Sequence, residues 1–362
     1  MMVVSKQQKI FIDFLRFCIG SAKEVPVSLK KADWKELYRI AQKQCLVGVL
    51  FDGIRKLPAE HVGMKKELLL QWMAGSQMLE KANIRLNDAA IEISEWFRKK
   101  GFRTCILKGQ GNALMYPNPY SRTPGDIDIW VEGGDKQVIT FVRSISPHEK
   151  ACYHHIEFPS YKGVEVEVHY RPSFLLCFWH NRKLQKYYES VKEKQFSHRI
   201  TLGEKEEIAI PTTEFNVIFQ LTHIFSHLMN EGIGVRQLLD YYFVLLHADI
   251  KDLAELQRNL KHFGLWKFAG AIMYIMQEVF GMPASRLIVP SNEKYGFFVL
   301  NEVLEAGNFG KYDERNRFGK SQLGHNLQRI YRDIRLVKFF PAEALSEPIF
   351  RTWHFFWRLR HK

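Results

Sequence analysis

The segment LKGQGNALMYPNPYSRTPGDIDIWV, residues 107–131, carries two carboxylates at a spacing that suits metal binding. Residues i and i+2 of a β-strand point to the same face, so Asp126 and Asp128 would lie side by side while Ile127 and Ile129 enter the core. Like charges held this close are unfavourable unless a cation compensates them, and Mg²⁺ prefers oxygen ligands of this kind. The alternative is a charged strand edge without a metal, which is common.

A third carboxylate is available in GVEVEVHY, residues 163–170. Glu165, Glu167 and His169 alternate with valines, so they would share one face of a strand. If this strand lies beside the first one, either glutamate could complete a cluster of three carboxylates. Such a cluster would hold two metal ions about 3.5–4 Å apart for in-line phosphoryl or nucleotidyl displacement. For Glu165 we favour a half-solvated edge strand.

Positive charge in the same stretch suits phosphate oxygens. Lys108 and Arg122 both precede the acidic pair, and an arginine or lysine side chain can neutralise a phosphate. The neighbouring Gly109-Gln110-Gly111 could begin a dinucleotide-binding G-x-G-x-x-G loop. Position 114 is leucine, however, and the longer βαβ pattern of that fold is missing.

Two further pairs of polar residues lie one helical turn apart. His223 and His227 have the i, i+4 spacing of a metal-binding pair, but zincins need H-E-x-x-H and a third ligand. The intervening Ile-Phe-Ser favours helix packing instead. Arg236 and Asp240 share the same spacing, and we expect them to form a structural ion pair along one helix.

The elements that must position these residues change along the chain. Residues 1–100 have helical periodicity, clearest in LNDAAIEISEWFRKKG, where Gly101 stands at the expected helix end. Residues 101–210 contain the strand patterns FRTCILKG, DIDIWVE, YHHIEF and GVEVEVHY, a helix in DKQVITFVRSI and a turn in PSYKG. Residues 211–362 are helical again. Helices are predicted from Thr212 and near 235–248, 252–263, 266–281, 293–306 and 320–338.

These patterns predict an α+β fold in which a small mixed sheet is flanked by helices. We assign an N-terminal helical segment to 1–100, the α/β core to 101–210 and an all-helical C-terminal domain to 211–362. The boundaries are changes of periodicity, and no flexible linker separates the parts.

Composition and charge restrict the class of protein. The net charge of +13 favours anionic partners such as nucleotides, RNA or a lipid surface. No stretch reaches 18 uninterrupted apolar residues, so no membrane span is expected. Lys6, Lys9, Asp13 and Arg16 interrupt the first apolar run, which indicates the amphipathic helix of a cytoplasmic protein rather than a signal peptide. The five cysteines form no C-x-x-C and suit buried, reduced thiols better than disulfides or a zinc site.

The order of these motifs resembles the DNA polymerase β-type nucleotidyltransferase superfamily: K-G, then R-x-x-x-D-x-D, then a strand carboxylate two residues before a histidine. More narrowly, LKG, SRTPGDIDIWV and VEVHYRP are similar to the uncharacterised bacterial nucleotidyltransferase family. The later H-x-x-x-H followed by R-x-x-x-D, in LTHIFSHLMNEGIGVRQLLDYYFVLL, extends the resemblance. Together these motifs span roughly residues 85–250, with moderate specificity.

The resemblance implies a role for each matching residue. Glu167 rather than Glu165 matches the third carboxylate, because it stands two residues before His169. The implied catalytic and metal-binding residues are Asp126, Asp128 and Glu167; the implied nucleotide-binding residues are Lys108, Gly109 and Arg122; further cleft residues are His169, His223, His227, Arg236 and Asp240. The Gly-Ser dipeptide usual in the wider superfamily is replaced here by Lys108-Gly109 without a serine.

The function implied by the resemblance is transfer of a nucleoside monophosphate from an NTP, such as ATP, to a hydroxyl acceptor, with Mg²⁺ or Mn²⁺ as cofactor. An RNA end, a protein or a small molecule could be the acceptor, and the sequence does not choose among them. Two alternatives remain. One is a catalytically inactive nucleotide- or RNA-binding protein of the same fold. The other is an accessory protein on a membrane surface, because the C-terminal FRTWHFFWRLRHK mixes basic and aromatic residues.

Overall fold

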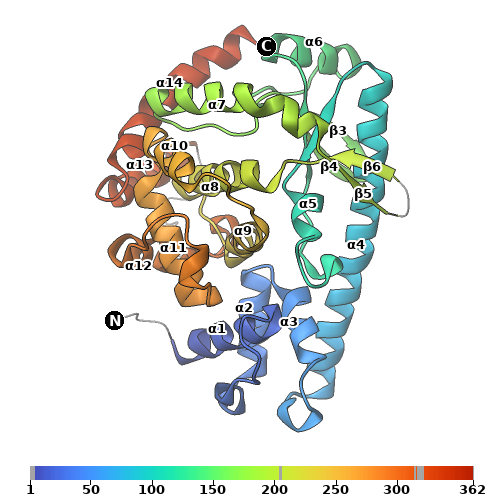
Figure 1. Cartoon of the computed structure of the whole chain (residues 1–362), viewed down its shortest axis with the longest axis vertical. Coiled ribbons are helices and arrows are strands. Elements are labelled where there is room, and N and C mark those ends of the chain that lie inside the picture. The colour runs from blue at the N-terminus through green and yellow to red at the C-terminus, as the bar shows by residue number, and fades with distance from the viewer. Residues whose placement is uncertain (1–4, 204–205, 314, 316–321, 362) are drawn as a thin grey trace.

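The computed structural model describes residues 5–203, 206–313, 315 and 322–361, and within them a four-stranded mixed sheet is flanked by helices from both ends of the chain (Figure 1). This arrangement confirms the α+β fold expected from the sequence. Residues 1–4, 320–321 and 362, which fall within predicted helices or the C-terminal tail, lie outside the described residues.

The N-terminal hundred residues are helical, as predicted. Their α-helices are α1 (Lys6–Ile19), α2 (Trp34–Lys43), α3 (Val47–Ile54) and α4 (Lys66–Lys99), with 3₁₀ turns η1 (Val27–Lys31) and η2 (Ala59–His61). Helix α4 is far longer than the 86–100 segment that the periodicity indicates. Its first half buries only Trp72, so the apolar stripe that marks a helix in the sequence is weak there. It ends as predicted, with Gly101 at φ +85°.

The sheet is formed by the four predicted strands. They are β1 (Thr104–Leu107), β2 (Ile127–Val131), β3 (His155–Tyr161) and β4 (Val164–His169), in the spatial order β1-β2-β4-β3. Strands β2 and β4 are parallel, whereas the β1–β2 and β3–β4 pairs are antiparallel. The mixed sheet is not the parallel sheet that the dinucleotide-binding alternative requires.

One predicted turn is wrong in its position. PSYKG is not a turn throughout, because β3 continues to Tyr161. The chain reverses at Lys162 and Gly163, which have φ values of +52° and +75°. Two consecutive positive φ values are typical of the tight turns that match the twist of a β-hairpin.

Helices and a hairpin that the sequence patterns did not indicate complete the middle of the chain. The predicted helix is α6 (Asp135–Ile145); the additional elements are α5 (Gly109–Ala113), η3 (Pro119–Ser121), α7 (Phe178–Ser197), β5 (Arg199–Leu202) and β6 (Glu206–Ala209). Strands β5 and β6 form a separate antiparallel pair.

The C-terminal part is helical, as predicted. Its elements are α8 (Thr213–Asn230), α9 (Val235–His247), α10 (Leu253–His262), α11 (Trp266–Phe280), η4 (Ala284–Arg286), α12 (Glu293–Ala306), η5 (Asn308–Gly310), α13 (Gln322–Val337) and α14 (Pro341–Arg360). Thr212 caps the N-terminus of helix α8, because its side chain accepts a hydrogen bond from the backbone of Phe215. Among the described residues, no helix combines the length and apolarity needed to cross a bilayer.

The described residues form two hydrophobic cores. One core packs an apolar face of the sheet, including Ile127, Ile129 and Val168, against α4 and α6. The other joins the N-terminal helices to the C-terminal helices, which lie close together although they are far apart in sequence (Figure 1). With one face of the sheet buried against α4 and α6, the alternating polar residues of β2 and β4 point to the opposite face.

Candidate active site

The three predicted carboxylates meet at the polar face of the sheet. In the parallel pairing of β2 with β4, Asp128 stands directly opposite Glu167, and Asp126 immediately precedes β2. One oxygen from each of the three lies within 4.8 Å of the others. Glu165 is exposed and belongs to no such group among the described residues. Strand register therefore selects Glu167 over Glu165 as the third carboxylate of the cluster.

A cleft of about 500 Å³ opens over this cluster. Its walls contain every residue that the sequence nominated for the site, namely Lys108, Gly109, Arg122, Asp126, Asp128, Glu167, His169, His223, His227, Arg236 and Asp240. They come from the sheet, from the start of α5, from the loop before β2 and from helices α8 and α9. Residues more than 130 positions apart in sequence thus face one space large enough for a small ligand.

Lys108 is the cation closest to the carboxylates. Its Nζ atom lies 2.7 Å from Oδ1 of Asp128 and 3.3 Å from Nε2 of His223. The backbone of Lys108 has φ +53° and ψ −120°, a region that residues other than glycine rarely adopt. Such strain is maintained only where the surroundings enforce it, and it is frequent at functional sites. Lys108 combines this conformation with an ammonium group in contact with the carboxylates.

His169 is a second cation in contact with the cluster. Its Nε2 atom lies 2.9 Å from Oδ1 of Asp128 and 3.3 Å from Oε2 of Glu167. Burial by itself would lower the pKa of His169, but the hydrogen bonds and negative charge of the two carboxylates outweigh it and raise the pKa to about 9. The imidazole is therefore an imidazolium at neutral pH, and Nε2 donates its hydrogen bond to Asp128.

The positive charges of Lys108 and His169 compensate Asp128 more than Asp126. Burial would raise the pKa of Asp128, yet the Lys108 ammonium and the His169 hydrogen bond hold it well below its usual range. Asp126 faces the opposite situation: the neighbouring Asp128 charge, followed by burial, raises its pKa to about 6. The cluster thus keeps one carboxylate that is inadequately compensated, and an additional cation in the cleft would relieve it. Oxygen donors in this number fit Mg²⁺ or Mn²⁺.

Arg122, which the sequence predicts to contact phosphate, is paired with a carboxylate of α9. Its guanidinium group forms a bidentate pair with Asp240, with Nε 2.8 Å from Oδ1 and Nη2 2.9 Å from Oδ2. Both side chains are buried, and the hydroxyl of Tyr116 donates a further hydrogen bond of 2.7 Å to Asp240. This network ties the loop before β2 to α9.

The ion pair predicted between Arg236 and Asp240 is therefore wrong. Both carboxylate oxygens of Asp240 are already paired with Arg122. Arg236 instead donates a weak hydrogen bond of 3.4 Å to the carbonyl of Thr123, and its Nε atom has no partner within the described part of the chain. Arg236 lines the cleft, but this Nε atom is itself buried.

His223 and His227 stand on the wall of α8 that faces the sheet. Their Nε2 atoms lie 2.9 Å apart. Burial lowers the pKa of His223 well below its usual range and that of His227 to about 4, so both rings are neutral at pH 7. Neither belongs to a group of three potential metal ligands among the described residues. They offer hydrogen-bonding nitrogens opposite the carboxylates.

Sequence reasoning missed three residues at the edge of this cleft. Cys152, His154 and His155 line it beside Glu167, and Nδ1 of His155 lies 3.4 Å from Oε2 of Glu167. The only signal available was the dense run CYHH, which overlaps the start of the predicted strand YHHIEF, since clustered cysteine and histidine residues are typical of metal binding.

Two solved structures and one protein family show similarity to this chain. An antigenic nucleotidyltransferase-like protein from Paracoccidioides brasiliensis is 13% identical and aligns over 58% of this chain and 95% of its own, with a TM-score of 0.32. The Thermotoga maritima CCA-adding enzyme, solved with tRNA, is 13% identical over 69% of both chains, with a TM-score of 0.19. No curated protein sequence matches the chain. Residues 30–281 match the model of the family described as "Uncharacterised nucleotidyltransferase", and the chain belongs to this family.

Proposed function

We propose that this protein is a metal-dependent enzyme that transfers a nucleoside monophosphate from an NTP to a hydroxyl group of an acceptor. The observation that carries the proposal is the convergence of Asp126, Asp128 and Glu167 from adjacent strands, with ligand oxygens within 4.8 Å of one another, at the floor of a cleft of about 500 Å³. Membership of the nucleotidyltransferase family supports the class of reaction.

The three carboxylates would hold Mg²⁺ or Mn²⁺. Asp126 supports this role most directly, because its raised pKa shows that the existing cations compensate it inadequately. Divalent ions bound there would neutralise the triphosphate and lower the pKa of the attacking hydroxyl. His169, whose Nε2 atom contacts both Asp128 and Glu167, would orient these carboxylates toward a bound cation.

Lys108, Arg236 and the two helical histidines would contact the substrate. The Lys108 ammonium lies between Asp128 and His223, and once cations occupy the acidic cluster it can turn to a phosphate oxygen. Arg236 lines the same cleft and would bring a positive charge to the triphosphate. Arg122, by contrast, is fully engaged with Asp240, so we assign it the task of positioning the loop that carries Asp126.

A transfer assay tests the proposal. The protein is incubated with each α-labelled NTP, Mg²⁺ or Mn²⁺, and a cell extract containing RNA, protein and metabolites. Wild-type protein should label one fraction, which identifies the acceptor class, whereas Asp126→Asn/Asp128→Asn should label none. Nucleotide binding without transfer by wild-type protein would contradict the proposal and favour the inactive binding protein of the same fold.

The exposed end of α14 favours a second role in contacting an anionic membrane surface. Phe350 is buried, but Phe355 and Phe356 are 51% and 56% exposed, and Arg358 and Arg360 follow in the last turn. Apolar rings beside basic side chains suit a lipid headgroup region. Phe355→Ser/Phe356→Ser should abolish co-sedimentation with anionic vesicles while leaving the fold intact, because neither ring is in the core. Equal or absent sedimentation of both forms would refute this role.

A further inference from the structure

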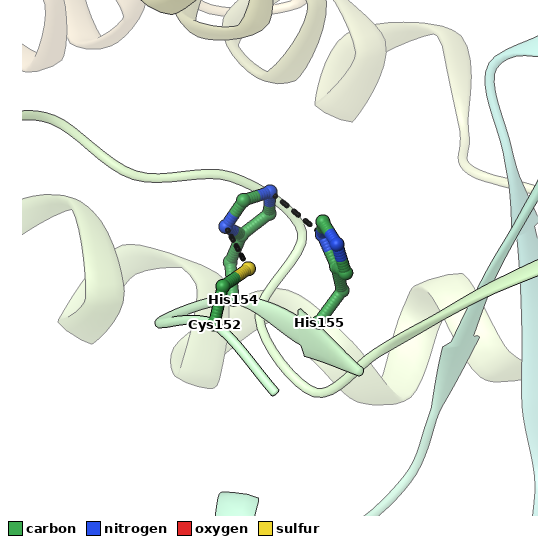
Figure 2. Close-up of side chains that lie close together, drawn as sticks. All are labelled: Cys152, His154 and His155. Atoms are coloured by element: carbon green, nitrogen blue, oxygen red, sulfur yellow. Dashed lines mark hydrogen bonds between the residues drawn. The ribbon is translucent and has the colours of Figure 1, made fainter. Parts of the chain in front are cut away.

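Cys152, His154 and His155 form a compact group of nitrogen and sulfur donors beside the acidic cluster. Figure 2 shows the imidazole of His154 between the other two side chains, with one ring nitrogen facing each. The Sγ atom of Cys152 lies 3.4 Å from Nδ1 of His154, and Nε2 of His154 lies 3.0 Å from Nδ1 of His155. One ligand atom from each of the three residues lies within 4.8 Å of the others.

The backbone holds these three residues in place. The amide of Cys152 donates to the carbonyl of His155 across 2.9 Å, which closes a tight loop just before β3. The carbonyl of His154 accepts hydrogen bonds from the amides of Tyr170 and Arg171, at 3.1 and 3.2 Å. The loop is thereby fastened to the end of β4, so the three side chains are presented from a braced segment. Ligands held this way lose little freedom when a metal binds.

We propose that Cys152, His154 and His155 bind a transition-metal ion of the zinc class, at a centre separate from the oxygen-ligated cations of the acidic cluster. A thiolate with two imidazoles is a donor set that selects zinc-like ions and is unsuited to Mg²⁺. Binding breaks the S–H bond of Cys152, forms a metal–sulfur bond and releases the proton to solvent.

The observed separations agree with this assignment. Zn–S bonds of about 2.3 Å and Zn–N bonds of about 2.0–2.1 Å place tetrahedral ligand atoms roughly 3.3–3.7 Å apart. The separation of 3.4 Å between Sγ of Cys152 and Nδ1 of His154 is already in that range. The 3.0 Å contact of His155 is with the other ring nitrogen of His154, Nε2, so His155 must rotate to share a metal ion with Nδ1, and one ligand atom from each of the three residues lies within 4.8 Å of the others. Three protein ligands would leave a fourth position for water or a substrate atom, and all three residues line the cleft that also contains Glu167.

Cobalt(II) is the probe for the first test, because a thiolate ligand gives it a near-ultraviolet charge-transfer band and its visible bands report coordination number. Wild-type protein stripped of metal should bind one equivalent of Co²⁺ with this band. Cys152→Ser should lose the band. Cys177→Ser is the matched control: that thiol is also partly exposed and also lies near a histidine and a glutamate, and its loss should leave the band unchanged. Asp126→Asn/Asp128→Asn should also keep the band, so failure of the proposed nucleotidyl transfer would not affect this result.

Zinc affinity, measured by competition with a chromophoric chelator, distinguishes a residue that binds the metal from one that only lies next to it. Loss of an outer-shell partner costs about 10–100-fold in metal affinity, so Cys152→Ser and His154→Ala should each exceed that range. A second arm uses wild-type protein alone: Zn²⁺, and not Mg²⁺, should slow alkylation of Cys152 by a maleimide several-fold. Absence of the charge-transfer band, its survival in Cys152→Ser, or alkylation that Zn²⁺ does not slow would overturn the proposal.

Discussion

Asp126 should destabilise the metal-free protein, so Asp126→Asn should stabilise it at neutral pH. The Asp128 charge and burial raise the pKa of Asp126 from 3.8 to about 6. A rise of this size corresponds to about 3 kcal/mol between the charged and neutral forms. Because the side chain is only partly buried, solvent screening reduces the expected gain to about 1–2 kcal/mol.

The sign of the pH dependence follows from the direction of this shift. A carboxyl group whose pKa is raised on folding destabilises the native state only when it is charged. The penalty is therefore absent below the unfolded value of 3.8 and complete above about pH 6. The stability difference between Asp126→Asn and wild type should open between pH 4 and pH 6 and stay constant above that.

Urea unfolding in the presence of a chelator, at several pH values from 4 to 7.5, measures this difference. Denaturant is preferable to heat, because a chain of this length shifts its melting temperature by only about 1 °C per kcal/mol. Glu165→Gln is the matched control, since Glu165 is an exposed carboxylate of the same sheet and lies outside the cluster. Mg²⁺ should stabilise wild type more than the variant and so close the gap. A variant less stable than wild type at pH 7.5, or a gain as large at pH 4, would refute the reasoning.

Three further predictions concern the partners of these carboxylates. Asp128→Asn should destabilise the metal-free protein, by about 3–5 kcal/mol, because it leaves the buried charges of Lys108 and His169 without their carboxylate. A urea midpoint equal to that of wild type would contradict this. The free energy of unfolding of the metal-free protein should fall as pH rises from about 6.5 to about 9. The reason is that protonated His169 stabilises the folded state fully below the pKa of the unfolded chain, about 6.5, and no longer does so above its folded pKa of about 9. His169→Gln should flatten this pH profile. Asp240→Asn should cost about 3–5 kcal/mol equally with and without ATP, whereas rescue by ATP would indicate that Arg122 contacts phosphate.

The strands and the carboxylates could be predicted because their signal is local. Alternation in DIDIWV and GVEVEVHY is visible within a few residues, and it follows directly from the geometry of a strand with one buried face. The choice between Glu165 and Glu167 needed more than alternation, because both share one face. The parallel register that sets Glu167 opposite Asp128 is a property of the assembled sheet.

Helix α7 escaped prediction because polar residues occupy part of its buried stripe. Asn181 and Gln195 are buried beside Leu184, Tyr188 and Phe196, so the apolar periodicity is interrupted although the helix is packed. Both amides are satisfied by hydrogen bonds to neighbouring segments, such as that from the backbone of Thr212 to Gln195. Those partners exist only in the folded protein.

The partner of Asp240 escaped prediction for a related reason. The i, i+4 rule ranks partners by distance along the helix and so selects Arg236. Arg122 lies 118 positions away, and the tertiary fold brings its guanidinium group to both oxygens of Asp240. The Cys152–His154–His155 group is local in sequence, but its closeness to Glu167 depends on the pairing of β3 with β4.

The sharing of one core by the two ends of the chain has a consequence for biosynthesis. Phe11 and Phe14 of α1 are fully buried, and Arg16 donates hydrogen bonds to carbonyls at the end of α11, more than 260 residues later. The nascent N-terminal helices therefore emerge from the ribosome long before their final neighbours, with apolar surface that a chaperone could shield. The buried residues of the core between α4 and the sheet have all been made once residue 210 has been reached, and of the described residues only Trp357 of α14 packs against this core later. During translation, the strands that carry the carboxylates can thus assemble before the first helix of the chain finds its place.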